Sequence, residues 1–183
     1  MLRVPLATSI SVAWTATSGA TSYNIYRKTL GGLFTFLTSV PAPATSFNNT
    51  GLTPNQTYLY KLTSFNGAES GLSAAAVATT LLFTDPTLST SIPVRKTHLD
   101  ELRTAVNAMR AAAGLSSFSF VDSAITAGST QIKRLHVTEL RDALDEARAT
   151  LGLSALIYTD PTIAVGSTKI KIAHFTDLRS GTQ

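Results

Sequence analysis

The second half of the chain repeats itself every 38 residues, and this feature most constrains the fold. Three histidines stand 38 residues apart, and each is followed three residues later by an acid and five residues later by an arginine. An aromatic-x-Asp motif precedes each histidine, at Phe83–Asp85, Phe120–Asp122 and Tyr158–Asp160. Three aligned copies predict an all-α helical repeat domain over residues 83–183, with units 83–119, 120–157 and 158–183.

Each unit carries the pattern of one long amphipathic helix that begins near its histidine. In the first unit, apolar residues recur at helical spacing from Leu99 to Met109. Gly114 and Gly152 follow the helical pattern, where a left-handed residue ends a helix. Asp85 and Asp160 each precede a proline, which predicts an N-cap and a short helical turn that ends in a loop such as 127–130.

A helix of this kind cannot bury its apolar face alone, so neighbouring units are expected to stack. The last unit extends only four residues beyond Arg179. Its helix is therefore expected to be shorter than the others and to leave an exposed apolar edge. Such an edge predicts fraying or a homodimer formed through it.

The first half of the chain differs from the second in charge and in periodicity. Residues 1–82 hold four basic residues and one acid, whereas residues 83–183 hold eleven basic residues and ten acids. Short runs with period two, such as Ser9–Trp14 and Tyr23–Arg27, alternate with turn residues. The pattern predicts a β-sandwich over residues 1–82 and a domain boundary near residue 82.

One segment of this half resembles a known family. Leu52, Pro54 and Tyr58 match the Leu-x-Pro-x-x-x-Tyr segment of fibronectin type III domains, and Ser64–Ser73 is similar to their last hairpin. The resemblance covers residues 2–82 and implies that Trp14 is a core residue. It also implies that the Tyr58 hydroxyl bonds back to nearby backbone. Few residues precede Ile10, so a short or missing first strand is expected.

The repeated polar residues are the candidates for chemistry. A histidine and an acid three residues later share a helix face, so His98 with Glu101, or His136 with Glu139, offers a metal chelate or an acid–base pair. Asp122 adds a further carboxylate, and glycoside hydrolysis needs only two. Repetition favours a structural role, in which the histidine begins the helix, the acid closes a capping box and the arginine bridges to a neighbouring aspartate. His174 would act in the same way in the last unit.

Several classes are disfavoured by composition. The chain has no cysteine, so thiol catalysis and disulfides are excluded. A net charge of +4 over 183 residues is too weak to indicate nucleic-acid binding, and no apolar run reaches the length of a membrane span. No cofactor motif or zinc motif is present, and we expect no resident cofactor or metal.

The leading interpretation is a non-catalytic adhesion, spacer or carbohydrate-binding module. Whether the chain is an enzyme stays open at this point, and if it is one, a hydrolase acting on glycosides is expected. The repeat resembles units of secreted multidomain bacterial proteins, which implies a fragment of a larger extracellular or cell-surface protein with a polysaccharide or cell-surface partner. The chain itself shows no signal peptide. The alternatives are a small glycosidase-like hydrolase that uses the repeated His and carboxylates, and a metal-stabilised assembly module.

Overall fold

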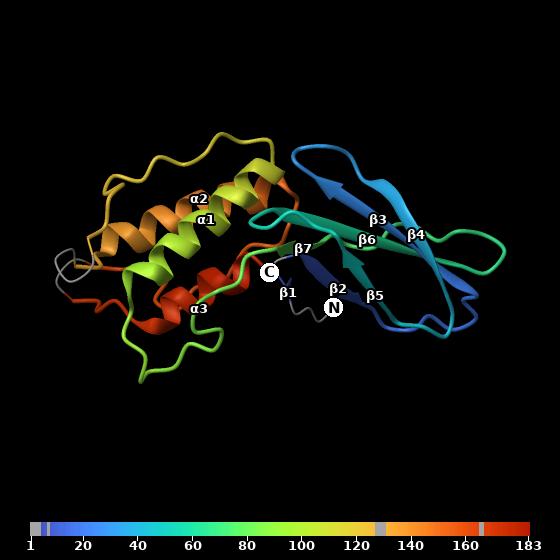
Figure 1. Ribbon diagram of the computed structural model, residues 1–183, viewed down its shortest axis with the longest axis horizontal. Coiled ribbons are helices and arrows are strands. Elements are labelled where there is room, and N and C mark those ends of the chain that lie inside the picture. The colour runs from blue at the N-terminus through green and yellow to red at the C-terminus, as the bar shows by residue number, and fades with distance from the viewer. Residues whose placement is uncertain (1–4, 7, 127–130, 165–166) are drawn as a thin grey trace.

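A computed structural model describes residues 5–6, 8–126, 131–164 and 167–183 of the chain. Strands fill the first half and three helices the second, as Figure 1 shows. The β-sandwich and the helices predicted from the sequence are therefore both present. The loop expected at 127–130 lies outside the described residues.

The sandwich consists of two antiparallel sheets. One has the order β1-β2-β5 and the other the order β4-β3-β6-β7. The strands are β1 (Pro5–Leu6), β2 (Ser9–Ala13), β3 (Ser22–Thr29), β4 (Thr35–Pro41), β5 (Ser46–Thr50), β6 (Thr57–Phe65) and β7 (Ala76–Thr79). In the described part of the chain, β1 comprises two residues, and the expectation of a short first strand stays a prediction because residues 1–4 and 7 lie outside that part.

The inner faces of the two sheets form a core of alternating residues, among them Ile10, Ile25 and Tyr60, which have no exposed surface. The Tyr58 hydroxyl accepts a hydrogen bond from the backbone N–H of Thr53 at 2.9 Å, which confirms the predicted tyrosine contact. Trp14 packs against this core while staying half-buried, with its ring centroid 5.3 Å from that of Tyr23.

The three helices are α1 (Lys96–Ala112), α2 (Arg134–Thr150) and α3 (Ile172–Gly181). They run in the same direction, with their C-terminal ends toward the sheets (Figure 1). Gly114 and Gly152 have φ values of 77° and 68°, so the predicted left-handed helix ends are confirmed. In each case the following leucine N–H bonds back to the helix at 2.9 Å and its side chain packs on the helical core.

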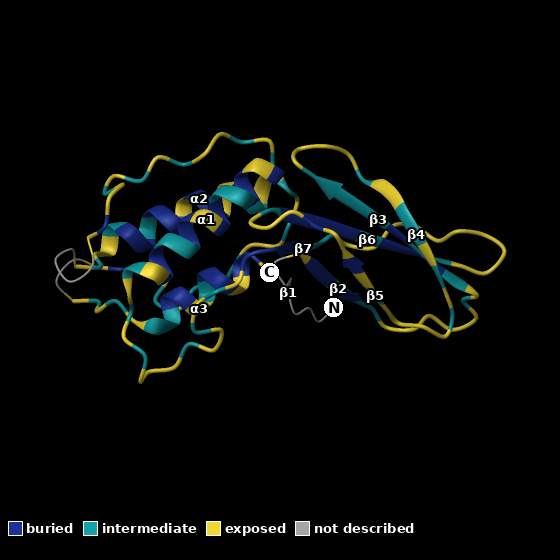
Figure 2. Ribbon diagram, in the orientation of Figure 1, coloured by how far each residue is buried: buried dark blue, intermediate teal, exposed yellow. Residues whose placement is uncertain are grey.

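The sandwich and the helices share one apolar core. Leu59 of β6 and Val77 of β7 point away from the sandwich interior and are buried with the inward residues of all three helices. Figure 2 shows dark blue, buried residues continuing from the sheet into the helices. A backbone bond from Gly31 to the carbonyl oxygen of Ala112, at 3.0 Å, joins the β3–β4 turn to the end of α1.

The connecting segment is fixed rather than loose. The Thr80 side chain is fully buried and its hydroxyl donates to the carbonyl oxygen of Thr53 at 2.6 Å, while Leu81 is 5% exposed. The two halves are thus held in one orientation by hydrogen bonds as well as by the shared core.

Two sequence predictions about the helical half are wrong. Asp85 and Asp160 begin no helical turn: their φ values are 50° and 49°, and bends follow them. No apolar edge is left open on α3 in its described surroundings, because Phe175 and Leu178 are fully buried among the other helices. The physical reason is that the three helices close on one another, so the short last helix has neighbours on both sides. The homodimer was predicted from an exposed apolar edge on this helix, and that edge is not present in the described residues.

Candidate functional site: the histidine contacts of the three helices

Every helix begins with the same histidine contact. The histidine is the third residue of its helix, and its Nδ1 accepts a hydrogen bond from the backbone N–H of the residue before the helix. These distances are 3.3 Å for His98, 3.1 Å for His136 and 3.3 Å for His174. The histidine, and not the acid that was predicted, therefore completes the capping box at the start of each helix.

The other ring nitrogen binds the aspartate of the aromatic-x-Asp motif. The distance from Nε2 to the aspartate Oδ2 is 3.0 Å for His98 and Asp85, 2.9 Å for His136 and Asp122, and 3.0 Å for His174 and Asp160. Since Nδ1 accepts an N–H, we assign the ring proton to Nε2, which donates it to the carboxylate. Both nitrogens are then occupied and all three rings are fully buried.

A cation completes each contact. The residue before each helix, namely Arg95, Lys133 or Lys171, places its side-chain nitrogen 3.2, 2.9 or 2.7 Å from the same aspartate oxygen. The His136 hydrogen bond and then Lys133 lower the pKa of Asp122 below its usual value. The pKa of Asp160 is lowered in the same sense, first by Lys171 and then by His174.

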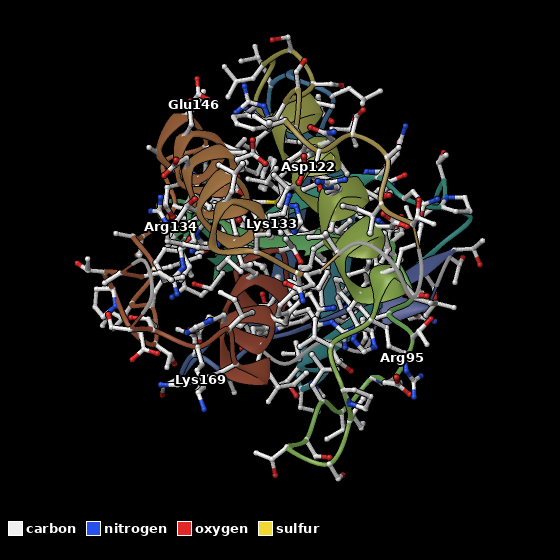
Figure 3. All side chains as sticks on the ribbon, turned by 90° about the vertical axis from the view of Figure 1, so that its left-hand side faces the viewer. Arg95, Asp122, Lys133, Arg134, Glu146 and Lys169 are labelled. Carbon is white, nitrogen blue, oxygen red and sulfur yellow. The ribbon has the colours of Figure 1, made fainter. Side chains whose placement is uncertain are left out.

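Figure 3 looks onto this end of the helices and labels Lys133 and Asp122 together with Arg95, Arg134 and Lys169. The basic residue that directly precedes each helix is paired with an aspartate, so its positive charge is partly neutralised at this end of the helices.

The acid three residues after each histidine accepts a hydrogen bond from a backbone N–H and not from the histidine ring. Glu101 accepts the backbone N–H of Thr84 at 2.8 Å, and Glu139 accepts that of Val121 at 2.9 Å. Asp177 does the same for Thr159 at 2.6 Å. Each of these carboxylates holds the aromatic-x-Asp segment that precedes its own helix and makes no hydrogen bond to the histidine in the described residues.

Arg103 and Arg141 each connect their helix to the segment that precedes the next helix. Arg103 stacks over the Phe120 ring, with its Cζ 4.6 Å from the ring centroid, and Arg141 stacks over Tyr158 at 4.4 Å. Their guanidinium groups also donate to backbone carbonyl oxygens of the same segments. The predicted bridge to the neighbouring aspartate is made by Arg141, which donates to the backbone carbonyl oxygen of Asp160 at 2.8 Å, whereas Arg103 reaches the carbonyl oxygen of Ser123.

The last arginine closes the arrangement. Arg179 stacks over Phe83 at 4.4 Å and donates to the carbonyl oxygens of Asp85 at 2.7 Å and Thr84 at 2.8 Å. These partners are more than 90 residues away in sequence. The chain of contacts thus runs from α1 to the segment before α2, from α2 to the segment before α3, and from α3 back to the segment before α1.

The contact made by Arg103 is the least complete of the three. Its hydrogen bond to the Ser123 carbonyl oxygen is 3.4 Å long, and its Nη2 is buried with no hydrogen-bond partner. Ser123 stands where the other two segments have proline, and only the two aspartates before proline have a left-handed φ among the three.

The structure brings together His136 with Asp122, and it separates both from chelating contact with Glu139. The same separation holds for His98 and Glu101. In the described part of the chain, no three His, Asp or Glu side chains are grouped so as to hold a metal ion. Sequence reasoning missed the arginine–aromatic stacking, although an aromatic residue before each histidine and an arginine after it were visible in the sequence.

None of the helices in the described ranges has both the length and the apolar character of a membrane-spanning segment.

Comparison with known proteins places one part of the chain. A poly(3-hydroxybutyrate) depolymerase of Delftia acidovorans is 40% identical over 72 residues, which are 38% of this chain and 14% of that enzyme. The chain therefore matches a small part of its relative. A Fn3-like protein from Clostridium thermocellum is 29% identical, over 45% of this chain and 82% of that one, with a TM-score of 0.37. A mutant of the domain FN3tt is 26% identical, over 42% and 81%, with a TM-score of 0.38.

The fibronectin type III family matches residues 4–80. This range covers all seven strands and stops where the buried connecting segment begins. Residues 4–80 are therefore a fibronectin type III domain.

Proposed function

We propose that the chain is a non-catalytic adhesion or spacer module of a larger extracellular bacterial protein. The observation that carries this proposal is that each repeated histidine uses both ring nitrogens in buried contacts. A general base needs a free lone pair within reach of a substrate, and a metal ligand needs one for the metal. The three histidines have none to offer while the helices are folded.

The organisation of the chain supports the same role. We propose a boundary at residues 82 and 83, with units 83–119, 120–157 and 158–183 acting as one closed repeat module. The recurrence of the same histidine, acid and arginine contacts in every unit supports this division. A residue that serves one reaction centre is needed once, whereas a residue that joins units is needed once in each.

The comparison supports a place in a larger protein. The relative named a depolymerase has about seven times the length that this chain matches, as its 14% coverage indicates. Fibronectin type III domains and the resemblance of the repeat to units of secreted proteins both favour an extracellular location. A rigid body made of a sandwich and a helical module suits spacing or surface attachment between other domains.

The test measures turnover and stability on the same proteins. Wild type and the single variants His98→Ala, His136→Ala and His174→Ala are assayed on chromogenic glycosides and esters, and their unfolding is followed by circular dichroism. We expect no turnover, and a similar loss of about 2–4 kcal/mol in each variant, because each removes a fully buried ring with its two hydrogen bonds and leaves a backbone N–H without its acceptor. Turnover by the wild type that disappears in one folded variant would contradict the proposal.

A further inference from the structure

The outer face of the four-stranded sheet is covered by the helices only in part. On β6, Leu59 lies under the helices, whereas Lys61 is next along the same face and stays half-exposed. On β3, Asn24 and Tyr26 alternate with the buried Tyr23 and Ile25, so they also point outward. A set of polar and aromatic side chains therefore lies on a flat sheet surface beside the helical module.

A fixed carboxylate stands on this surface. Glu69 accepts hydrogen bonds from Asn24 Nδ2 at 2.9 Å, from the Tyr26 hydroxyl at 2.7 Å and from the Thr63 hydroxyl. All three donors converge on Oε1, and none of the described residues donates to Oε2 in addition. Asn24, Thr63 and Tyr26 together lower the pKa of Glu69 to about 2, so the group is ionised at neutral pH. The protein thus holds an exposed acceptor oxygen in one position.

Exposed aromatic surface lies next to this carboxylate. Phe36 of β4 is paired with Tyr26 across the strands, and the ring centroids are 5.9 Å apart at an angle of 76°. Phe36 is 58% exposed, although it is one of the larger apolar side chains of the domain. Figure 2 shows β4 with exposed and half-buried residues, in contrast to the buried β6. An exposed ring of this size on a flat sheet is a feature of binding surfaces.

The charges around the rings restrict what fits there. Lys28 lies two residues beyond Tyr26 on the same face, and Lys61 pairs with Tyr26 from the neighbouring strand. Glu69 is the single acid of residues 1–82, which carry four basic residues. The lysines would repel a cationic partner, and the fixed Glu69 carboxylate would repel an anionic partner. An uncharged partner that has hydroxyl donors beside an apolar face is repelled by neither charge.

We propose that Asn24, Tyr26, Phe36 and Glu69 form a binding platform for a neutral polysaccharide. The C–H face of a sugar ring stacks on Phe36, and a neighbouring sugar hydroxyl donates to Glu69 Oε2. Tyr26 and Asn24 act as positioning residues that hold the carboxylate beside the ring. This inference rests on the proposed non-catalytic role, to which it adds a ligand class and a site.

The test uses the full chain and three neutral polymers, namely amorphous cellulose, mannan and chitin, in pull-down and affinity electrophoresis. The variants are Phe36→Ala, which removes the stacking ring, and Glu69→Gln, which removes the charge but keeps an acceptor for the three donors. Their matched controls are Ile157→Ala and Asp142→Asn, both exposed and remote from the sheet in sequence. Circular dichroism verifies that each variant folds. We expect at least one polymer to bind, with Kd raised about tenfold or more in both platform variants and unchanged in the controls.

The other outcomes separate this inference from the proposed function. If the wild type binds none of the three polymers, or if both platform variants retain its binding, the platform is overturned and the spacer role stands. Granules of poly(3-hydroxybutyrate), which have an apolar surface and few hydroxyl donors, serve as a further probe. Binding to them that depends on Phe36 and not on Glu69 would overturn the polysaccharide assignment. Release of soluble sugar from a bound polymer would instead contradict the non-catalytic role.

Discussion

Replacing Arg179 with methionine tests whether the three helices close into a ring. Its guanidinium group is nearly buried, donates to two carbonyl oxygens of the first unit and stacks over Phe83. It also lies 3.3 Å from Glu101, whose side chain is only 15% exposed. Methionine keeps much of the apolar stem but removes the charge and the donors.

The expected loss follows from these contacts. Removing one partner of a nearly buried ion pair typically costs about 3–5 kcal/mol, because the other charge stays buried without compensation. For a chain of this size, each kcal/mol lowers Tm by about 2–4 °C, so the expected shift is about 6–20 °C. In an open stack, Arg179 would stand at the solvent-exposed end and its replacement would cost about 0.5 kcal/mol or less.

The assay is urea unfolding followed by two probes. Circular dichroism reports on the helices, and fluorescence of Trp14, the single tryptophan, reports on the sandwich. Arg134→Met is the matched control, since Arg134 is exposed at the start of α2. Because Leu59 and Val77 join the two halves through one core, we expect both probes to shift together in Arg179→Met. A variant as stable as the control would refute the closed arrangement.

Three further predictions concern packing and pH. Gly181→Ala should cost about 1–3 kcal/mol in thermal unfolding, because a Cβ there would come within 2.5 Å of the Leu156 side chain. Gly31→Ala should make the unfolding transitions seen by circular dichroism and by Trp14 fluorescence differ, because a φ of 70° is strained for alanine and the added Cβ would lie 3.3 Å from Gly114 Cα, just after α1. Transitions that still coincide would argue against this contact as a joint between the two halves. Asp122 and Asp160 have lowered pKa values in the folded state, so their contribution to stability is complete above the usual pKa of 3.8 and is lost as pH falls through the lowered value. Stability measured from pH 6 down to about pH 2 should therefore decline less steeply in Asp160→Asn than in wild type.

The sandwich could be predicted well because its signals are local. Alternation in Ser9–Trp14 and Tyr23–Arg27 identified strands, and the segment ending at Tyr58 carried its own hydrogen bond within five residues. The helix ends at Gly114 and Gly152 were equally local, since a left-handed glycine and the leucine after it act within one turn.

The candidate site was predicted less well because its contacts lie at longer range. The spacing of His98 and Glu101 correctly places both on one helix, but it cannot show that the ring turns to Asp85, thirteen residues back. Each basic residue before a histidine was visible in the sequence, yet its pairing with an aspartate depends on the fold of the preceding segment. The periodicity identified which residues matter, whereas the partners depended on tertiary structure.

Closure of the ring could not be foreseen from periodicity at all. A repeat with a fixed period predicts the same neighbour contact at every step, and it leaves open whether the last unit meets solvent or the first unit. The difference here is made by Arg179 and Phe83, which are 96 residues apart in sequence yet form the same stacked pair as Arg141 and Tyr158 within 17. The closed group of three helices presents its C-terminal ends to the sheet, where Leu59 and Val77 continue the same core. The orientation of the sandwich, and of any surface on it, is then set by the helices rather than by the connecting segment alone.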